Sequence, residues 1–222
     1  MNKLNHIAFI MDGNGRWGEK KRKSRNFGHF KGVETVKKVV SSSIRFKVSI
    51  VTFYVFSSEN WKRPKNEINY LFKLIKNYFT KEINNIISEG IKINILGDLG
   101  KLSKDIKEIL LKTTKLTEKN NKIIVNLAIN YGSKNEILLA AKRVKKKDNI
   151  NNFKNKLYTK NMPDPDILIR TGGHRRLSNF MLWQLAYSEL FFLKKLWPDF
   201  NSSDLKRIID KYKKSKRNFG AI

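Results

Sequence analysis

The alternation of short apolar runs with amphipathic segments is the feature of this sequence that most restricts its fold. Runs rich in Ile, Val and Phe have the length of buried strands and cover residues 6–11, 49–56, 91–96, 123–130 and 166–170. Helical patterns lie between them, over residues 32–43, 67–89, 103–119 and 133–146, and a last helix is expected from Ser202 or Ser203. This alternation predicts an α/β fold with a mostly parallel central sheet covered by helices.

Length and composition indicate an ordinary globular chain. Its 222 residues predict a single domain over residues 1–222, and the polar stretch 148–155 is expected to be a loop. The absence of cysteine excludes disulfides, thiolate metal sites and cysteine nucleophiles. No apolar run approaches the ~18 residues of a membrane-spanning helix, and the first residues lack the pattern of a signal peptide. We therefore expect a cytoplasmic protein.

The net charge of +28 is the most unusual compositional property. Such a charge favours nucleic acid, an anionic membrane surface or anionic substrates as partners. A second explanation is codon bias, because Lys, Asn and Ile are all abundant, as in an AT-rich genome. The basic residues are scattered, and dense runs occur only at residues 20–25 and 142–147. The second run lies on or just after a predicted helix and is interpreted as a solvated face.

The segment 6–17, H-I-A-F-I-M-D-G-N-G-R-W, carries the strongest chemical signal. A strand that stops at Asp12 and opens into glycines presents backbone N–H groups, which suit a diphosphate. Asp12 would repel a bare diphosphate, so its position makes sense if a divalent metal lies between the two anions. Ligands of parallel sheets bind at the carboxyl ends of the strands, which is where this turn is expected.

Three other interpretations of this segment compete with a metal–diphosphate site. Residues 13–18 fit G-x-G-x-x-G, but the next strand-like run comes too late and ends in serines instead of an acid. A calcium loop also begins D-x-N, but Arg16 and Lys23 stand where an oxygen ligand and the closing glutamate belong. An ordinary glycine-rich turn remains open from this segment alone.

Two further polar clusters directly follow predicted strands. Residues 57–64, S-S-E-N-W-K-R-P, offer hydroxyls, an amide, an acid and an arginine, although helix capping explains part of the pattern. Residues 170–179, R-T-G-G-H-R-R-L-S-N, carry three arginines, which match phosphate oxygens in a bidentate way. Nucleic-acid binding is the alternative, but this run has no interleaved aromatic residue before Phe180.

The stretch 179–200 is almost wholly apolar around one acid, Glu189. We interpret it as buried core together with a subunit interface. Because an unpaired acid is costly in such surroundings, Glu189 is expected to have an arginine or a metal ion as partner.

Over residues 6–219 the sequence resembles the cis-prenyltransferases, and bacterial undecaprenyl diphosphate synthases most of all. The resemblance rests on M-D-G-N-G-R-W, R-x-F-G-H, F-S-S-E-N-W-x-R-P, I-R-T-G-G, R-L-S-N-F and W-x-x-A-Y-x-E-L. The D-D-x-x-D motif of trans-prenyltransferases is missing. The resemblance implies transfer of isopentenyl units from isopentenyl diphosphate onto an allylic diphosphate, with farnesyl diphosphate as starter. The product would be a long cis-polyprenyl diphosphate, such as undecaprenyl diphosphate, for the lipid carrier of cell-wall synthesis. A basic nucleic-acid-binding protein is kept as the alternative.

The resemblance also implies a role for each matching residue. Asp12 would hold Mg²⁺ and assist departure of the allylic diphosphate, Glu189 would be the second metal-site acid, and Asn60 would take part in proton removal. The allylic diphosphate would contact the first motif and the residues following it: Gly13, Asn14, Gly15, Arg16, Trp17, Arg25 and His29. The second cluster would lie between the two substrates, through Ser57, Ser58, Glu59, Asn60, Trp61 and Arg63. Isopentenyl diphosphate would be held by Arg170, Arg176, Leu177 and Ser178.

The expected partners are the two diphosphate substrates, a second copy of the chain and an anionic membrane at the inner face of the plasma membrane, without nucleic acid. Arg217 opens a tail, R-N-F-G, that resembles the family's R-x-x-G tail, which reaches across a homodimer. His174 stands where the family usually has an acid, and Arg175 where some relatives have a histidine. The growing chain requires an apolar tunnel, for which the helix over 67–89, with Phe53, Val55, Ile93 and Ile123, is the candidate wall. Packing in the core is the alternative for each of these residues. The sequence does not fix the product length.

Overall fold

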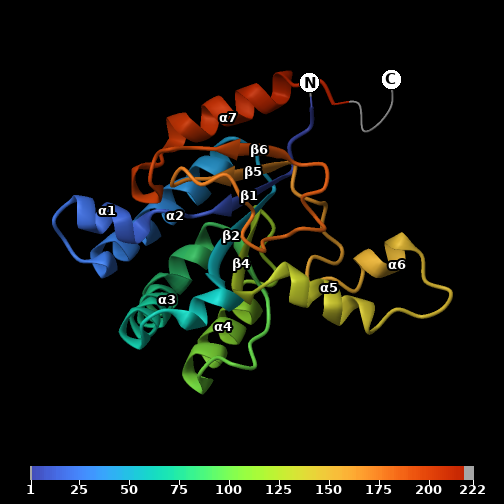
Figure 1. Ribbon diagram of the computed structural model, residues 1–222, viewed down its shortest axis with the longest axis horizontal. Helices are drawn as coiled ribbons and strands as arrows, with labels where there is room; N and C mark the ends of the chain where they lie inside the picture. Colours follow the sequence, from blue (N-terminus) through green and yellow to red (C-terminus); the bar gives the residue numbers. More distant parts are fainter. Residues whose placement is uncertain (1, 218–222) are drawn as a thin grey trace.

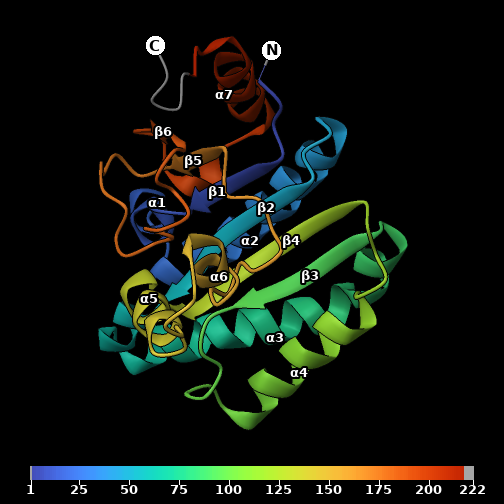
Figure 2. The same cartoon turned by 90° about the vertical axis from the view of Figure 1, so that its right-hand side faces the viewer.

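The computed structural model describes residues 2–217 and contains one parallel sheet of six strands. The strands are β1 (His6–Ile10), β2 (Ile50–Ser57), β3 (Ile91–Leu96), β4 (Ile123–Tyr131), β5 (Ile167–Arg170) and β6 (Glu189–Phe192). Their order is β3-β4-β2-β1-β5-β6, as Figure 2 shows from bottom to top. All five pairings are parallel, so the carboxyl ends of the strands share one edge.

Helices connect the strands and cover both faces of the sheet (Figure 1). They are α1 (Asn14–Lys20), α2 (Arg25–Arg45), α3 (Lys65–Ser88), α4 (Lys104–Leu116), α5 (Ser133–Ala141), α6 (Ile150–Lys154) and α7 (Ser202–Lys214). Two short 3₁₀ helices, η1 (Ser58–Lys62) and η2 (Trp197–Asp199), lie close to the carboxyl edge of the sheet. Among the helices within residues 2–217, none is long and apolar enough to cross a bilayer.

The central strands are buried on both faces, which explains their continuous apolar sequence. Ile7 and Phe9 of β1 point into a large core cluster that also contains residues of α2, α3, α4 and α7. Ala8 and Ile10 point the other way, into a smaller cluster with Phe180 and neighbouring residues. The alternation of side chains along a strand therefore divides the core into two layers.

The structure confirms the α/β class, the five predicted strands and the five predicted helices, with α2 starting earlier than the pattern suggested. Besides the two 3₁₀ helices, two α-helices and one strand were not predicted. α1 forms where we expected only a turn, α6 forms inside the predicted loop 148–155, and β6 forms inside the apolar stretch 179–200. The basic run 142–147 follows α5, as expected.

Candidate active site

The site lies at the carboxyl edge of the sheet, where the segments after β1, β2 and β5 meet. The order β2-β1-β5 brings these three strands together although residues 12, 57 and 170 are far apart in the sequence. One cavity of about 990 Å³ opens there and continues between α2 and α3. Most predicted site residues line its polar end: Asp12, Gly13, Asn14, Gly15, Arg16, Arg25, His29, Ser57, Asn60, Arg63, Arg170, Arg176 and Ser178.

Asp12 is the carboxylate at the centre of this polar end. Its Oδ1 accepts a hydrogen bond from Arg16 at 2.9 Å, and its Oδ2 accepts one from Arg170 at 3.0 Å. The Asp12 carbonyl also accepts from the Thr171 hydroxyl at 2.8 Å and from the Trp197 amide at 3.1 Å. The position of Asp12 is thus fixed through both its backbone and its side chain, while its side chain remains 23% exposed to the cavity.

Two glycines make the turn after Asp12 possible. Gly13 has a φ of +110°, and a Cβ at this position would lie 2.7 Å from Leu196 Cδ2. A Cβ at Gly15 would lie 2.5 Å from the guanidinium carbon of Arg25. The Arg25 guanidinium therefore packs against the first turn of α1, whose leading N–H groups have no acceptor within the helix. This arrangement offers charge and backbone donors to an anion.

Glu67, in the first turn of α3, binds three of the predicted basic residues. Its carboxylate accepts from Arg25 Nε at 3.2 Å and from Arg63 at 3.1 Å, and His29 Nε2 lies 3.3 Å away. Glu67 is buried, and burial opposes its ionisation, but Arg25 and its neighbours outweigh this and hold the pKa of Glu67 below its usual value. Burial lowers the pKa of His29 more than the charge of Glu67 raises it.

Sequence reasoning missed Glu67 because a glutamate in a first helical turn usually needs no explanation beyond the helix dipole. The signal available was its position four residues after Arg63, the spacing of side chains that meet on one helical face.

The segment after β2 serves the fold and the site at the same time. The Ser57 amide donates to Asn60 Oδ1 at 3.1 Å, so Asn60 caps η1 while it also lines the cavity. Trp61 does not line the cavity, because its ring packs against Phe56 and its Nε1 donates to Asn130 at 2.8 Å. The alternative interpretation, capping of the helix that starts near Glu67, is wrong, because the N-cap of α3 is Pro64 and has no side-chain hydrogen bond; Asn60 caps η1 instead.

Arg170 is held deep beside Asp12. It is only 4% exposed, and besides Asp12 it donates to Ser178 Oγ at 2.8 Å and to the Arg176 carbonyl. Its Nε is buried without a hydrogen-bond partner among the described residues. The loop that follows is strained, since Ser178, Asn179 and Met181 all have positive φ angles. Such strain is typical of loops that hold functional groups.

Several predicted residues lie outside the cavity lining. Trp17 donates to Asp199 at 2.7 Å and stacks on Phe27, whereas Glu59 accepts from Asn179 at 2.7 Å. The group as a whole comprises Trp17, Ser58, Glu59, Trp61, Leu177 and Glu189. Of the four strand residues expected to line the tunnel, Val55 and Ile93 do so, while Phe53 and Ile123 are wholly enclosed in the core and do not.

Glu189 lies far from Asp12 of the same chain. It begins β6 and pairs with Ile167, which in turn pairs with Ile7 near the start of β1. Asp12 lies five positions beyond Ile7, so at ~3.3 Å per residue the two acids are about 17 Å apart along the sheet. Mg²⁺–oxygen bonds are about 2 Å long, so one chain cannot hold a single ion with both acids. No ion pair formed among residues 2–217 involves Glu189, so the arginine partner we expected is not found there.

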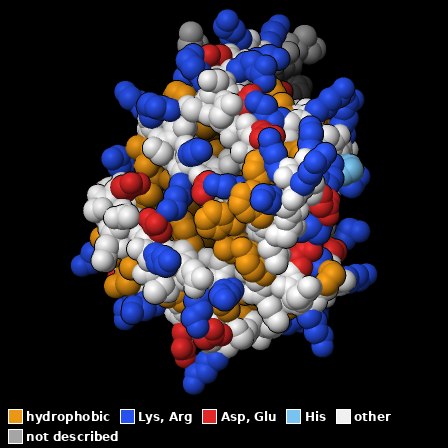
Figure 3. Space-filling model, turned by 90° about the vertical axis from the view of Figure 1, so that its left-hand side faces the viewer, with side chains coloured by type: hydrophobic (Ala, Val, Ile, Leu, Met, Phe, Trp, Pro, Cys, Tyr) orange, Lys and Arg blue, Asp and Glu red, His pale blue; other side chains and the backbone are white. Residues whose placement is uncertain are grey.

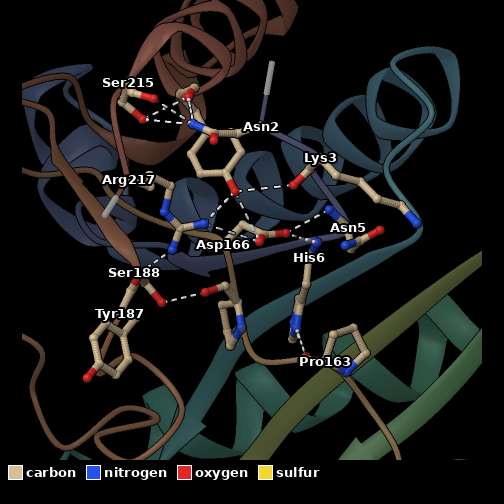
Figure 4. A network of polar contacts seen from close by, with 12 residues as sticks. Asn2, Lys3, Asn5, His6, Pro163, Asp166, Tyr187, Ser188, Ser215 and Arg217 are labelled. Atoms are coloured by element: carbon tan, nitrogen blue, oxygen red, sulfur yellow. Dashed lines mark hydrogen bonds and ion pairs between the residues drawn. The ribbon is translucent and has the colours of Figure 1, made fainter. Parts of the chain in front are cut away.

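Arg217 lies beside Asp166 (Figure 4), whose backbone carbonyl accepts the amide of Glu189. Its guanidinium donates to the Tyr212 hydroxyl at 2.7 Å and lies 3.8 Å from Asp166, the residue before β5. Asp166 also accepts the amides of Asn5 and His6 at the start of β1. This network is far from Asp12 of the same chain. The rest of the R-N-F-G motif, residues 218–220, lies outside the described residues.

The residues at Asp12 fit a magnesium ion that shares its ligands with a substrate. Within residues 2–217 no group of three or more His, Cys, Asp or Glu side chains is arranged to hold a metal. Mg²⁺ commonly uses one or two carboxylates and completes its shell with phosphate oxygens and water. Asp12 is a single accessible carboxylate with the cations Arg16 and Arg170 beside it, which suits such a shared ion.

Comparison with known proteins agrees with this geometry. Residues 10–220 match the family model described as putative undecaprenyl diphosphate synthase. The chain is 44% identical to an isoprenyl transferase of Clostridium tetani, over 98% of this chain and 89% of that protein. It is 43% identical to the farnesyl-diphosphate-specific ditrans,polycis-undecaprenyl-diphosphate synthase of Haemophilus influenzae, over 97% of this chain and 94% of that protein.

Solved structures show the same fold. A probable undecaprenyl diphosphate synthase from Campylobacter jejuni superposes with a TM-score of 0.85 at 34% identity, covering 99% of this chain and 100% of that one. Lavandulyl diphosphate synthase from Lavandula x intermedia, solved with dimethylallyl diphosphate, gives a TM-score of 0.93 at 28% identity. The match covers 97% of this chain and 98% of that one.

The site and these matches define an α/β prenyltransferase. The chain belongs to the undecaprenyl diphosphate synthase family of isoprenyl transferases, the cis-prenyltransferases. This decides between the transferase and the nucleic-acid-binding interpretations in favour of the transferase.

Proposed function

We propose that this isoprenyl transferase adds isopentenyl units to farnesyl diphosphate and makes a long cis-polyprenyl diphosphate of the undecaprenyl type. The observation that carries this proposal is the continuity of the cavity, which joins a cationic end at Asp12 to an apolar end between α2 and α3. An allylic diphosphate with a growing hydrocarbon tail likewise has one charged end and one apolar end. The substrate named for the Haemophilus influenzae relative supports farnesyl diphosphate as the starter.

Two sets of residues suit two diphosphates. Arg16, Arg25 and His29, with the turn after Asp12, would bind the allylic diphosphate. Arg170, Arg176 and Ser178 would bind isopentenyl diphosphate, because Arg176 is exposed to the cavity and the buried Nε of Arg170 is a donor without a partner. Asp12 contacts Arg16 from the first set and Arg170 from the second, so the two diphosphates would lie on either side of it.

The chemistry separates into charge stabilisation and proton removal. Mg²⁺ bound through Asp12 and diphosphate oxygens would neutralise charge on the leaving group. Arg16, Arg25 and backbone donors stabilise the diphosphate as its C–O bond breaks. The double bond of isopentenyl diphosphate then forms the new C–C bond, and the proton lost from its C2 leaves toward the diphosphate. Asn60, at the cavity wall between the two sets, orients the groups that receive this proton.

Glu189 and Arg217 support a homodimer whose sites are completed across the interface. Both lie at the end of the sheet opposite Asp12, near β6, which is an edge strand. Leu190 of β6 and Tyr187 before it are well exposed, as an interface that is open in the isolated chain would be. In this arrangement the partner subunit's Glu189 would be the second acid at a metal held by Asp12.

The product binds more tightly with each addition. Every isoprene unit adds five carbons, and burial of each carbon contributes ~0.8 kcal/mol, or up to roughly 4 kcal/mol per unit. Release of a long product into water would therefore limit turnover, and an anionic membrane at the inner face of the plasma membrane would accept it. The test of the function is incubation of the enzyme with farnesyl diphosphate, labelled isopentenyl diphosphate and Mg²⁺. Products that lengthen by five-carbon steps on chromatography are expected, and no incorporation of label would overturn the proposal.

A further inference from the structure

The apolar part of the cavity is a cleft that opens sideways between α2 and α3. Val36 and Val40 form one wall, Leu74, Ile75 and Phe79 form the other. Figure 3 views the molecule from the side of these helices and shows hydrophobic side chains uncovered in the middle of the face, with Lys and Arg around them. A hydrocarbon chain in this cleft therefore has an opening along its side as well as the polar end at Asp12.

One ion pair closes the middle of this opening. Lys37 of α2 donates to Glu82 of α3 at 2.7 Å, and its ammonium lies 5.2 Å from the centre of the Tyr78 ring. Asn85 holds the second oxygen of Glu82 at 3.1 Å. Among the ion pairs of residues 2–217, the only others that join these two helices are at the site end, where Arg25 and His29 meet Glu67. The Lys37–Glu82 pair is thus the polar link between the helices over the hydrocarbon part of the cleft.

This link is easily broken in solution, but the opening it guards is apolar. Lys37 and Glu82 are 42% and 28% exposed, and ion pairs with such exposure contribute little to stability. Separation of the helices would expose the hydrophobic walls, which water disfavours and lipid does not. The opening is therefore expected to stay narrow in water and to widen against an apolar phase.

The charged residues around the opening indicate which kind of apolar phase fits there. Lys37, Lys38 and Arg45 are exposed on α2 beside the cleft, and Phe30 is exposed on the same helix. The acids of this rim are Glu82, which is paired with Lys37, and Glu89. A basic rim around an apolar opening is complementary to a bilayer with anionic headgroups.

We propose that the face formed by α2 and α3 docks on an anionic bilayer, and that the finished product leaves sideways into it by separation of Lys37 from Glu82. This inference rests on the proposed function, since it requires a long prenyl product. Product release would use the face of α2 and α3 as its surface and the Lys37–Glu82 pair as its polar link.

The experiment uses the absence of cysteine from the chain. The variant Lys37→Cys/Glu82→Cys is cross-linked with a short bismaleimide, which fixes the two helices across the opening. The matched control is Lys76→Cys/Asp105→Cys, which replaces an equally short 2.7 Å pair between α3 and α4, away from the cleft. Each protein is also prepared with its cysteines capped by a monofunctional maleimide. The first and later turnovers are measured with phosphatidylglycerol-containing vesicles.

The cross-link at 37 and 82 is expected to leave the first turnover intact and to slow later turnovers at least about tenfold, because release and not chemistry is obstructed. The capped form and both forms of the control are expected to turn over like the unmodified enzyme. Later turnovers at the unmodified rate, an equal effect of the control cross-link, or loss of the first turnover as well would each overturn the proposal. Failure of the proposed function is distinguishable, because then the unmodified enzyme makes no polyprenyl product.

Docking is measured separately with an environment-sensitive dye on Ser41→Cys, at the rim of the cleft, or on Asn155→Cys, just after α6 on the other side of the sheet. Phosphatidylglycerol vesicles are expected to shift the emission of the dye at position 41 only, and phosphatidylcholine vesicles to shift neither. An equal shift at both positions would show that the charge binds without orientation and would overturn the assigned face.

Discussion

Arg170 donates to Oδ2 of Asp12 across 3.0 Å at a depth where Arg170 itself is almost wholly buried. The other oxygen of Asp12 binds Arg16, so one carboxylate joins the two sets of residues assigned to the two diphosphates. Removal of this side chain is therefore expected to have two effects: it would delete the proposed metal anchor, and it would leave a buried guanidinium without its counter-ion.

The conservative change Asp12→Asn is expected to lower turnover by about a thousandfold, because it removes a leading electrostatic group but keeps the size of the side chain. Asp12→Ala is expected to cost about 3 kcal/mol of stability as well, since one partner of a largely buried pair is lost. Kinetics and urea unfolding of both variants provide the check. Retention of a tenth of the activity by Asp12→Asn would contradict the assignment of Asp12.

Arg176→Ala is expected to raise the KM for isopentenyl diphosphate about tenfold or more and to change that for farnesyl diphosphate little, because one charge-assisted contact is removed from one site. Steady-state kinetics with each substrate varied in turn measure both constants. The converse variant, Arg25→Ala, should show the opposite preference. Equal effects on the two substrates would mean that the two sites are wrongly assigned.

Mixed dimers test whether Glu189 acts across the interface. Asp12→Asn and Glu189→Gln chains are each expected to be nearly inactive as homodimers. In a heterodimer of the two, one site combines an intact Asp12 with the partner subunit's intact Glu189, so activity should return to about half of wild type per dimer. If both acids served one site within the same chain, every heterodimer site would remain damaged and no activity would return.

Glu67→Gln is expected to raise the KM for the allylic diphosphate several-fold, because Arg25, His29 and Arg63 lose the charge that holds them together. The carboxylate of Glu67 raises the pKa of His29, against the larger effect of burial, so its removal should lower the pKa of His29 further. NMR titration of the three histidines follows this directly. Glu108→Gln, on the exposed face of α4, is the control. An unchanged His29 titration would exclude the positioning role of Glu67.

Stability should fall in acid because of His6. Burial lowers the pKa of His6 from 6.5 to about 4. Its hydrogen bond to the Pro163 carbonyl and the charges of Asp166 and Asp164 act in the opposite direction but are outweighed. Between these values the unfolded chain binds a proton that the folded chain does not. The contribution of neutral His6 to the free energy of unfolding is therefore fully present above pH 6.5. It is lost as the pH falls toward 4, and the loss amounts to about 3 kcal/mol.

Urea unfolding across this pH range measures the loss for the native chain, for His6→Gln and for the control His174→Gln. The loss in free energy of unfolding between pH 6.5 and pH 4 should shrink for His6→Gln and remain for His174→Gln. An identical pH dependence in all three proteins would contradict the neutral, buried state of His6.

The sequence determined the elements and most of the cationic end of the cavity. The alternation of apolar and amphipathic segments is a local property, so it predicted five strands, five helices and the parallel class. The turn after Asp12 and the clusters at Asn60 and Arg170 directly follow strands. Because all carboxyl ends share one edge of a parallel sheet, their convergence followed from the class of fold.

Only the tertiary structure decided which residues share a site. The resemblance assigned Glu189 to the same metal site as Asp12, whereas the register of β6 puts Glu189 at the opposite edge of the sheet within one chain. Glu67 carried no unusual local pattern, yet it gathers three cations from α2 and the segment after β2. Phe53 is shielded from the cavity by aromatic contacts with Phe9 and Trp197. The physical reason is that strand order, register and packing are long-range properties, which bring together side chains that no short stretch of sequence relates to one another.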